Sequence, residues 1–249
     1  MPETWTPVLI AVVATAVFLY GFSKTAMPVA GMVAGPMLTV ALGATTASGF
    51  VMPLLLLADL FALARYRQHA NWPLIFKLVP GVLVGIALTA ILFKFADTHT
   101  LGRVIGVLIL ISVLLEVWRR RHPRTDEEGR PHRIAVGFFG TLAGMTTMAA
   151  NAGGAAMTLY LINMRVSMLA FMGTFAWFFF IINAIKVPIL VGLGFLNGQT
   201  LLADLWFAPL IVVGALLGYA IFKKMNETVF TNIALVLSAV ASVWLIIHG

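Results

Sequence analysis

A stretch of the first half of the chain recurs in the second half without a gap. Residues 80–100 (PGVLVGIALTAILFKFADTHT) match residues 209–229 (PLIVVGALLGYAIFKKMNETV), 129 positions later. The identical pairs are Pro80/Pro209, Val84/Val213, Gly85/Gly214, Leu88/Leu217, Phe93/Phe222 and Lys94/Lys223. Upstream, a small shift places Gly49 over Gly173 and Asp59 over Asn183. An internal duplication in an apolar chain is typical of secondary transporters built from two repeats.

The composition places the chain in a membrane. Hydrophobic residues make up 61% of the chain and charged residues 10%, whereas soluble chains carry about a quarter charged residues. A crossing helix needs about 20 apolar residues, so 249 residues leave room for about eight to ten crossings. The start of the chain, MPETWT, lacks a basic region, so we expect the first apolar stretch to be retained as a span. Cysteine is absent, which excludes disulfides and thiolate chemistry.

The apolar segments divide into two sets of five. They cover residues 7–22, 26–42, 47–64, 74–95, 101–118, 134–150, 153–163, 167–189, 200–221 and 227–247. The second and seventh are short and rich in glycine, which predicts broken or re-entrant helices. Two halves with an odd number of segments must have opposite orientations. We therefore expect an all-α polytopic membrane protein of two inverted repeats, residues 1–118 and 134–249, joined by a cytoplasmic linker at 119–133.

Positive charges set the expected orientation. With the N-terminus outside, most lysines and arginines fall in inside turns, including the run WRRRHPRTDEEGRPHR at 118–133. The net charge of +7 is therefore interpreted as topology signals and lipid contacts, not as a nucleic-acid surface.

Two sequence breaks predict a binding site near the middle of the membrane. Ser23 and Lys24 precede PVAGMVAGP (28–36), and the matching stretch of the second half contains Asn151, Gly153 and Gly154. Broken helices leave backbone N–H groups that attract anions, and Lys24 would add a positive charge. The alternative for Lys24 is a lysine that reaches the cytoplasmic interface. The alternative for the second break is tight helix packing.

A carboxylate within an apolar segment is costly unless it is paired or functional. Asp59 lies in MPLLLLADLFALARYR, where Arg65 follows, and its repeat mate is Asn183. Asp59 either neutralises a lysine or carries a coupled proton. Lys186, before Pro188, resembles Lys24 in its setting.

Sequence signatures of enzymes and metal sites are missing. All five histidines lie in loops or at the chain end, and there is no H-E-x-x-H, G-x-S-x-G or Walker motif. We therefore expect no enzyme, no catalytic residues, no metal and no cofactor.

The motifs taken together resemble those of the sulfite exporter TauE/SafE family, also called the TSUP permeases. The first half contributes GFSKTAMPVAGMVAGPM, MPLLLLADLFALARYR and WPLIFKLVPGVLVGI, and the second half LAGMTTMAANAGGAAMTLYLI and GTFAWFFFIINAIKVP. These stretches follow the family's order over nearly the whole chain. Asn151 stands where many relatives carry histidine, and Ala155 replaces a proline.

The resemblance implies a multi-pass permease of the bacterial inner membrane. Its solute would be a small organosulfur or related anion such as sulfite, a sulfonate or sulfoacetate, moved by alternating access. Lys24 and Lys186 would supply charge at the site, with a proton or sodium as the coupling ion. A passive anion channel and a membrane-embedded enzyme or assembly factor are the alternatives, and a homodimer stays open.

Overall fold

The structure, a computed structural model, is helical throughout the residues that it describes. These are residues 5–92, 103, 107, 110–111, 113–114, 117–118, 133–150, 153–192 and 194–248. Within them, five helices are long and apolar enough to cross a membrane. The prediction of an all-α polytopic membrane protein is confirmed.

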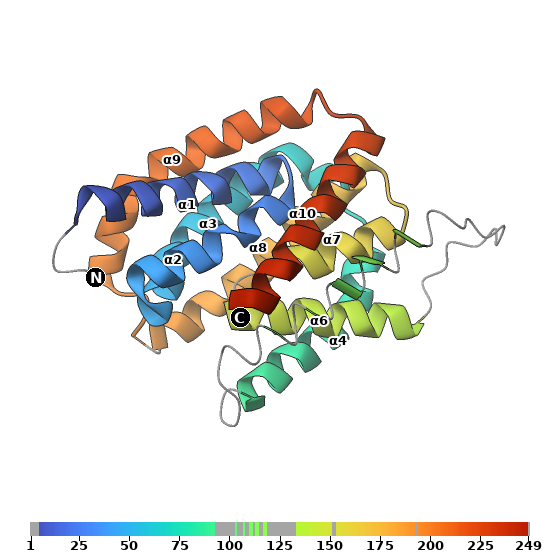
Figure 1. Ribbon diagram of the computed structural model, residues 1–249, viewed down its shortest axis with the longest axis horizontal. Coiled ribbons are helices and arrows are strands. Elements are labelled where there is room, and N and C mark those ends of the chain that lie inside the picture. Colours follow the sequence, from blue (N-terminus) through green and yellow to red (C-terminus); the bar gives the residue numbers. More distant parts are fainter. Residues whose placement is uncertain are drawn as a thin grey trace. The chain divides into compact units, whose positions relative to one another are not determined.

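The helices follow the predicted apolar segments to within a few residues at each end (Figure 1). They are α1 (Pro7–Thr25), η1 (Pro28–Met32), α2 (Ala34–Leu42), α3 (Ala44–Tyr66), η2 (Arg67–His69), α4 (Trp72–Leu92), α6 (Arg133–Ala150), α7 (Gly154–Asn163), α8 (Met168–Gly192), α9 (Gly198–Phe222) and α10 (Glu227–His248), where η marks a 3₁₀ helix. Most of the predicted fifth segment and all but the last residue of the 119–133 linker lie outside the described residues.

The chain forms two compact units, and each combines parts of both sequence halves. The first unit consists of residues 1–70 and 172–225, and the second of residues 71–171 and 226–249. The division into two inverted repeats at 1–118 and 134–249 stays a prediction, because the compact units do not follow it.

In the first unit, α1 and α3 run in the same direction. Phe207, near the start of α9, contacts both Trp5, just before α1, and Phe50, early in α3. At the other end, the hydroxyl of Tyr66 donates a hydrogen bond of 2.7 Å to the carbonyl oxygen of Thr25. The connection between the two helices must therefore return to the side where α1 begins. It does so through the 5-residue η1 and the 9-residue α2, which confirms the predicted break in the second segment.

Helices α1 and α9 of this unit lie side by side (Figure 1) and touch through their backbones. Gly21 lies against the backbone of Ile211, and Gly214 lies against the backbone of Phe18. A Cβ atom at either glycine would collide with main-chain atoms of the other helix. Only glycine permits this approach, as in other small-residue contacts between membrane helices.

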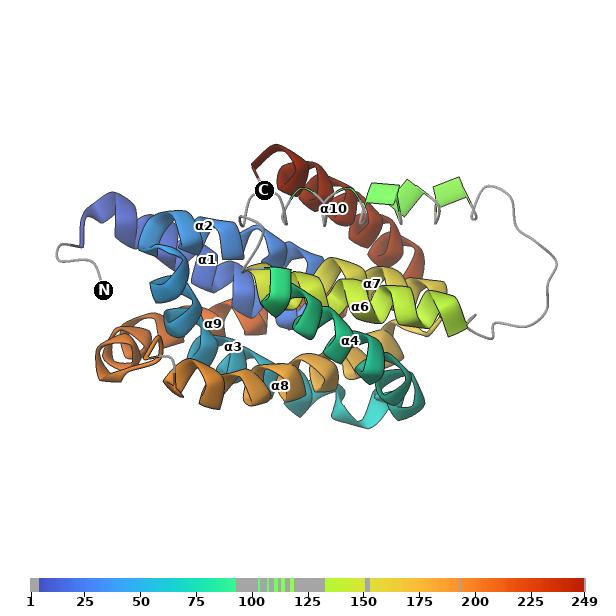
Figure 2. The ribbon, with the colours of Figure 1, turned by 90° about the horizontal axis from the view of Figure 1, so that it is seen from below.

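Helices α4 and α6 of the second unit pack in the same way (Figure 2). Gly144 lies against the backbone of Val82, and Gly85 lies against the backbone of Thr141. These two contacts again place a glycine of each helix on the main chain of the other.

The two helix pairs make contacts at positions that the internal duplication relates to each other. Val82 and Ile211, like Gly85 and Gly214, are 129 positions apart, which is the spacing of the duplication. The residues that they contact on α1 and α6 are also separated by one constant spacing. Gly21 and Gly144 are 123 positions apart, and so are Phe18 and Thr141. The α4–α6 pair therefore repeats the contacts of the α9–α1 pair, and each pair takes one helix from each half.

Candidate functional site

Lys24 lies in the last turn of α1 and is buried, with 7% of its surface exposed. Its Nζ atom is 2.6 Å from Oδ1 of Asp59, a fully buried residue of α3. A cation at the C-terminal end of a helix is also favoured by the helix dipole. The side chain points into the protein and holds a carboxylate there.

The second carboxylate oxygen of Asp59 is also occupied. The side-chain Nδ2 of Asn183, on α8, donates a hydrogen bond of 2.7 Å to Oδ2 of Asp59. Each oxygen thus has one partner, and the negative charge is compensated by Lys24. A buried ion pair is tolerated only with such geometry and hydrogen bonding.

Asp59 and Asn183 are repeat mates, and they meet where α3 and α8 pass each other. Gly49, near the start of α3, lies against the backbone just beyond α8, and Gly173, near the start of α8, lies against the end of α3. The two helices are therefore antiparallel and make reciprocal contacts. Such contacts are those expected where two inverted repeats face each other.

Helix α8 supplies two further side chains to this cluster. Phe179, one turn before Asn183, places its ring 4.7 Å from Nζ of Lys24, a distance suited to a cation–π contact. Lys186, three residues after Asn183, is partly buried and close enough to Lys24 for the two positive charges to interact. We refer to Lys24, Asp59, Phe179, Asn183 and Lys186 as the Lys24 cluster.

The backbone just after Lys24 is hydrogen-bonded to the last turn of α1. The N–H groups of Ala26 and Met27 donate to the carbonyl oxygens of Phe22 and Ser23. The hydroxyl of Ser23 donates to the carbonyl oxygen of Tyr20 at 2.9 Å. The chain thus closes the end of α1 with its own hydrogen bonds before η1 begins. The binding of an anion by N–H groups of the break at 28–36 stays a prediction.

Arg65 is placed apart from the Lys24 cluster. Its side chain is exposed, and its guanidinium carbon is 4.7 Å from the centre of the Tyr219 ring. Asp59 and Arg65 are six residues apart, so they lie on different faces of α3.

The residues of the second break belong to the second unit. Gly153 and Gly154 are buried at the start of α7, whose residues up to Ile162 are buried as well. Asn151 lies outside the described residues.

Two features of the first unit escaped the sequence prediction. The first is Phe179, which nothing distinguishes within the run FAWFFF. Its position one turn before Asn183 is the only signal that could have found it. The second is Asp204, whose carboxylate is buried in α9. Among the described residues, no three His, Cys, Asp or Glu side chains lie together as a metal site would require.

The Lys24 cluster contains two ammonium groups for one carboxylate, next to an aromatic ring and an amide. An oxyanion could take the place of the Asp59 carboxylate at Lys24, because both offer an oxygen to the same donor. The cluster contains no nucleophile–base pair of the kind that covalent catalysis uses.

The family model of the sulfite exporter TauE/SafE matches residues 12–245. This match includes nearly the whole chain, and the protein belongs to that family. Neither the curated proteins nor the solved structures give a significant match. Together with its five long apolar helices, the family places the chain among multi-pass membrane transporters.

Proposed function

We propose that this member of the sulfite exporter TauE/SafE family is a secondary transporter of small sulfur oxyanions, such as sulfite, sulfonates or sulfoacetate. Lys24 binds the anionic group, and Lys186 adds positive charge. The observation that carries the proposal is the buried ion pair of Lys24 and Asp59 at the end of a broken helix. The chain would lie in the inner membrane of a bacterium, with its N-terminus outside.

A lysine inside a membrane protein requires a reason, because burial of an ammonium group is costly. Lys24 is held by Asp59, and Asp59 is oriented by Asn183. In the described state the carboxylate occupies the position that a substrate anion would need. Exchange of one oxygen acceptor for another keeps the ammonium group paired, so the exchange costs less than the binding of an anion to an isolated buried site would.

The broken helix next to Lys24 supports a transport role. The backbone returns between the parallel helices α1 and α3 through η1 and α2, and irregular backbone at membrane depth is tolerated where it lines a protein cavity. Discontinuous helices next to a substrate site are typical of secondary transporters that work by alternating access. The family and this arrangement favour transport over enzymatic conversion of the anion.

Sulfite exchange in proteoliposomes tests the proposal. Wild-type protein is expected to exchange external radiolabelled sulfite for internal sulfite, and sulfonates are expected to compete. The double variant Lys24→Met/Asp59→Asn, which removes both charges of the pair, is expected to lose this exchange. Lys224→Met, at an exposed lysine, is the matched control and is expected to retain it.

Three outcomes would contradict the proposal. Wild-type rates in the double variant would remove Lys24 from the site. Electrical conductance far above transporter turnover would identify a passive channel. Chemical change of the recovered sulfite would identify an enzyme.

A further inference from the structure

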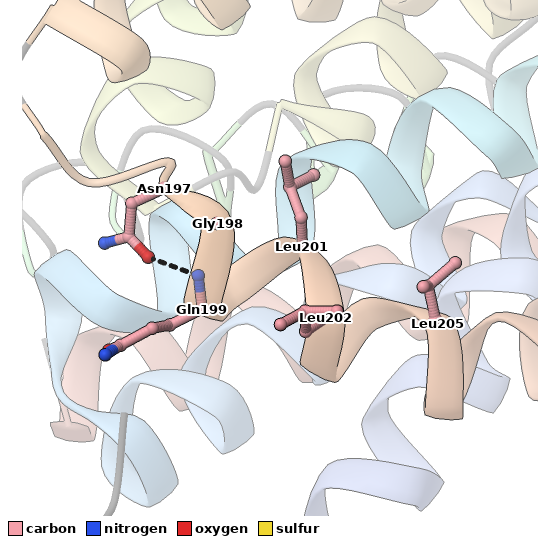
Figure 3. Close-up of a pocket in the computed structure, with 6 residues that line it drawn as sticks. All are labelled: Asn197, Gly198, Gln199, Leu201, Leu202 and Leu205. Carbon is pink, nitrogen blue, oxygen red and sulfur yellow. Dashed lines mark hydrogen bonds between the residues drawn. The ribbon is translucent and has the colours of Figure 1, made fainter.

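The first turns of α9 have two different faces. Leu201, Leu202 and Leu205 are exposed, and with the residues at the start of the helix they line an open, apolar hollow (Figure 3). Such a surface is expected to face lipid. Thr200 and Asp204 are buried on the other face, which is directed to the core of the first unit.

Asp204 has no hydrogen-bond partner among the described residues. The residue is buried, with 5% of its surface exposed, and neither carboxylate oxygen accepts a hydrogen bond from the described residues. The hydroxyl of Thr200, one turn earlier, is used in the capping box with Asn197 and donates to that residue's carbonyl oxygen at 2.7 Å. The ion pair of Lys24 with Asp59 is the only one that joins described side chains, so Asp204 has no described counter-charge.

The helices packed against α9 present no charged group at the depth of Asp204. Those helices are α1 and α3, and both run parallel to α9, with their starts near Phe207. Their titratable residues all lie in the later part of each helix: Tyr20, Lys24, Asp59, Arg65 and Tyr66. Glu3, before α1, lies outside the described residues.

A carboxylate that is buried without a counter-charge or hydrogen-bond donors is disfavoured relative to the neutral acid. We propose that Asp204 is a neutral carboxylic acid in the described state and carries the proton that is coupled to anion transport. In the cycle, the acid would release its proton to water on one side of the membrane and take up a proton from water on the other side, which restores the neutral acid and moves one proton across. The coupling role rests on the proposed transport function, whereas the protonation state does not.

The proton site and the Lys24 cluster lie at different depths of the same helix pair. Thr25, next to Lys24, donates a hydrogen bond of 2.7 Å to the carbonyl oxygen of Ala215 on α9. Asp204 precedes Ala215 by eleven residues, or about 16 Å along the helix axis. The proton and the anion would therefore not compete for one charge. Lys223 and Lys224 follow α9, which places Asp204 toward the outside by the positive-inside rule.

Infrared difference spectroscopy in ¹H₂O and ²H₂O tests the protonation state without any substrate. The purified protein at neutral pH is expected to show the C=O stretching band of a protonated carboxyl group, with an isotope shift. Asp204→Asn is expected to remove this band, whereas Asp59→Asn is expected to leave it in place. A band that persists in Asp204→Asn, or is absent from the wild type, would overturn the proposal even if the protein transports sulfite.

Transport under a proton gradient tests the coupling. In proteoliposomes, Asp204→Asn is expected to keep sulfite exchange at equilibrium but to lose the stimulation of uptake by an imposed pH gradient. Glu227→Gln, which removes an exposed carboxylate, is the matched control and is expected to keep that stimulation. Undiminished stimulation in Asp204→Asn would overturn the coupling role. Uptake driven by a sodium gradient and indifferent to pH would overturn it as well.

Discussion

Lys24→Met is expected to lower the free energy of unfolding by about 3–5 kcal/mol, because Asp59 would stay buried without its counter-charge. The two charged atoms are 2.6 Å apart, and Asp59 is fully buried. Asp59→Asn is expected to destabilise the protein as well, because it leaves the Lys24 ammonium group unpaired. The double variant Lys24→Met/Asp59→Asn removes both charges and is expected to be more stable than either single variant.

Denaturant unfolding of the detergent-purified protein measures this difference. The control is Lys224→Met, whose exposed side chain makes the same substitution nearly neutral, since surface changes usually stay within about 0.5 kcal/mol. A strong coupling between the two single variants is expected, as for any pair of residues in direct contact. Additive effects would show that the two charges do not depend on each other in the folded protein.

Gly144→Ala and Gly214→Ala are each expected to lower the free energy of unfolding by about 1–3 kcal/mol. At both positions a Cβ atom would collide with the main chain of the neighbouring helix, and no change of side-chain rotamer can relieve that clash. The helices must move apart instead, α6 from α4 and α9 from α1. We expect both substitutions to lower the free energy of unfolding, because Gly144 and Gly214 occupy the same kind of contact in the two equivalent helix pairs.

Gly137→Ala is the matched control for this test. Gly137 lies on α6 like Gly144, but a Cβ atom there would meet nothing. Alanine at an unobstructed helix position is expected to be neutral or to stabilise by up to about 1 kcal/mol. Thermal unfolding of the three variants measures this difference in stability, and we expect a lower midpoint for Gly144→Ala and Gly214→Ala than for Gly137→Ala. Similar midpoints for all three would contradict the close helix contacts.

The duplication in the sequence identified equivalent positions but not their partners. The spacing of Gly85 and Gly214 is the same whether each half packs on itself or exchanges helices with the other. Apolar periodicity and glycine breaks predicted where helices begin and end, because these depend on local sequence. The pairing of α1 with α9 depends on contacts between residues nearly 200 positions apart, and no local pattern reports such contacts.

The site was visible in the sequence only as isolated charges. Lys24 and Asp59 stood out because ionisable residues are rare in apolar segments, and neutralisation of a lysine by Asp59 was one of two interpretations. The contact between Asp59 and its own repeat mate Asn183 depends on how α3 and α8 pack against each other, and the duplication alone does not determine that packing. The hydrogen bonds that close the end of α1 were also hidden, since a glycine-rich break predicts where a helix ends but not how its N–H groups are paired.

The most direct test of Lys24 as the anion-binding group is thermal stabilisation of purified protein by a panel of sulfite, sulfonates, sulfoacetate, carboxylates and a neutral sulfoxide. A ligand at about 100 times its dissociation constant stabilises the native state by about 2.7 kcal/mol. We expect a sulfur oxyanion to raise the unfolding midpoint of the wild type and of Lys224→Met, and to leave Lys24→Met/Asp59→Asn unchanged. An equal shift in the double variant, or no shift with any anion in the wild type, would contradict anion binding at Lys24.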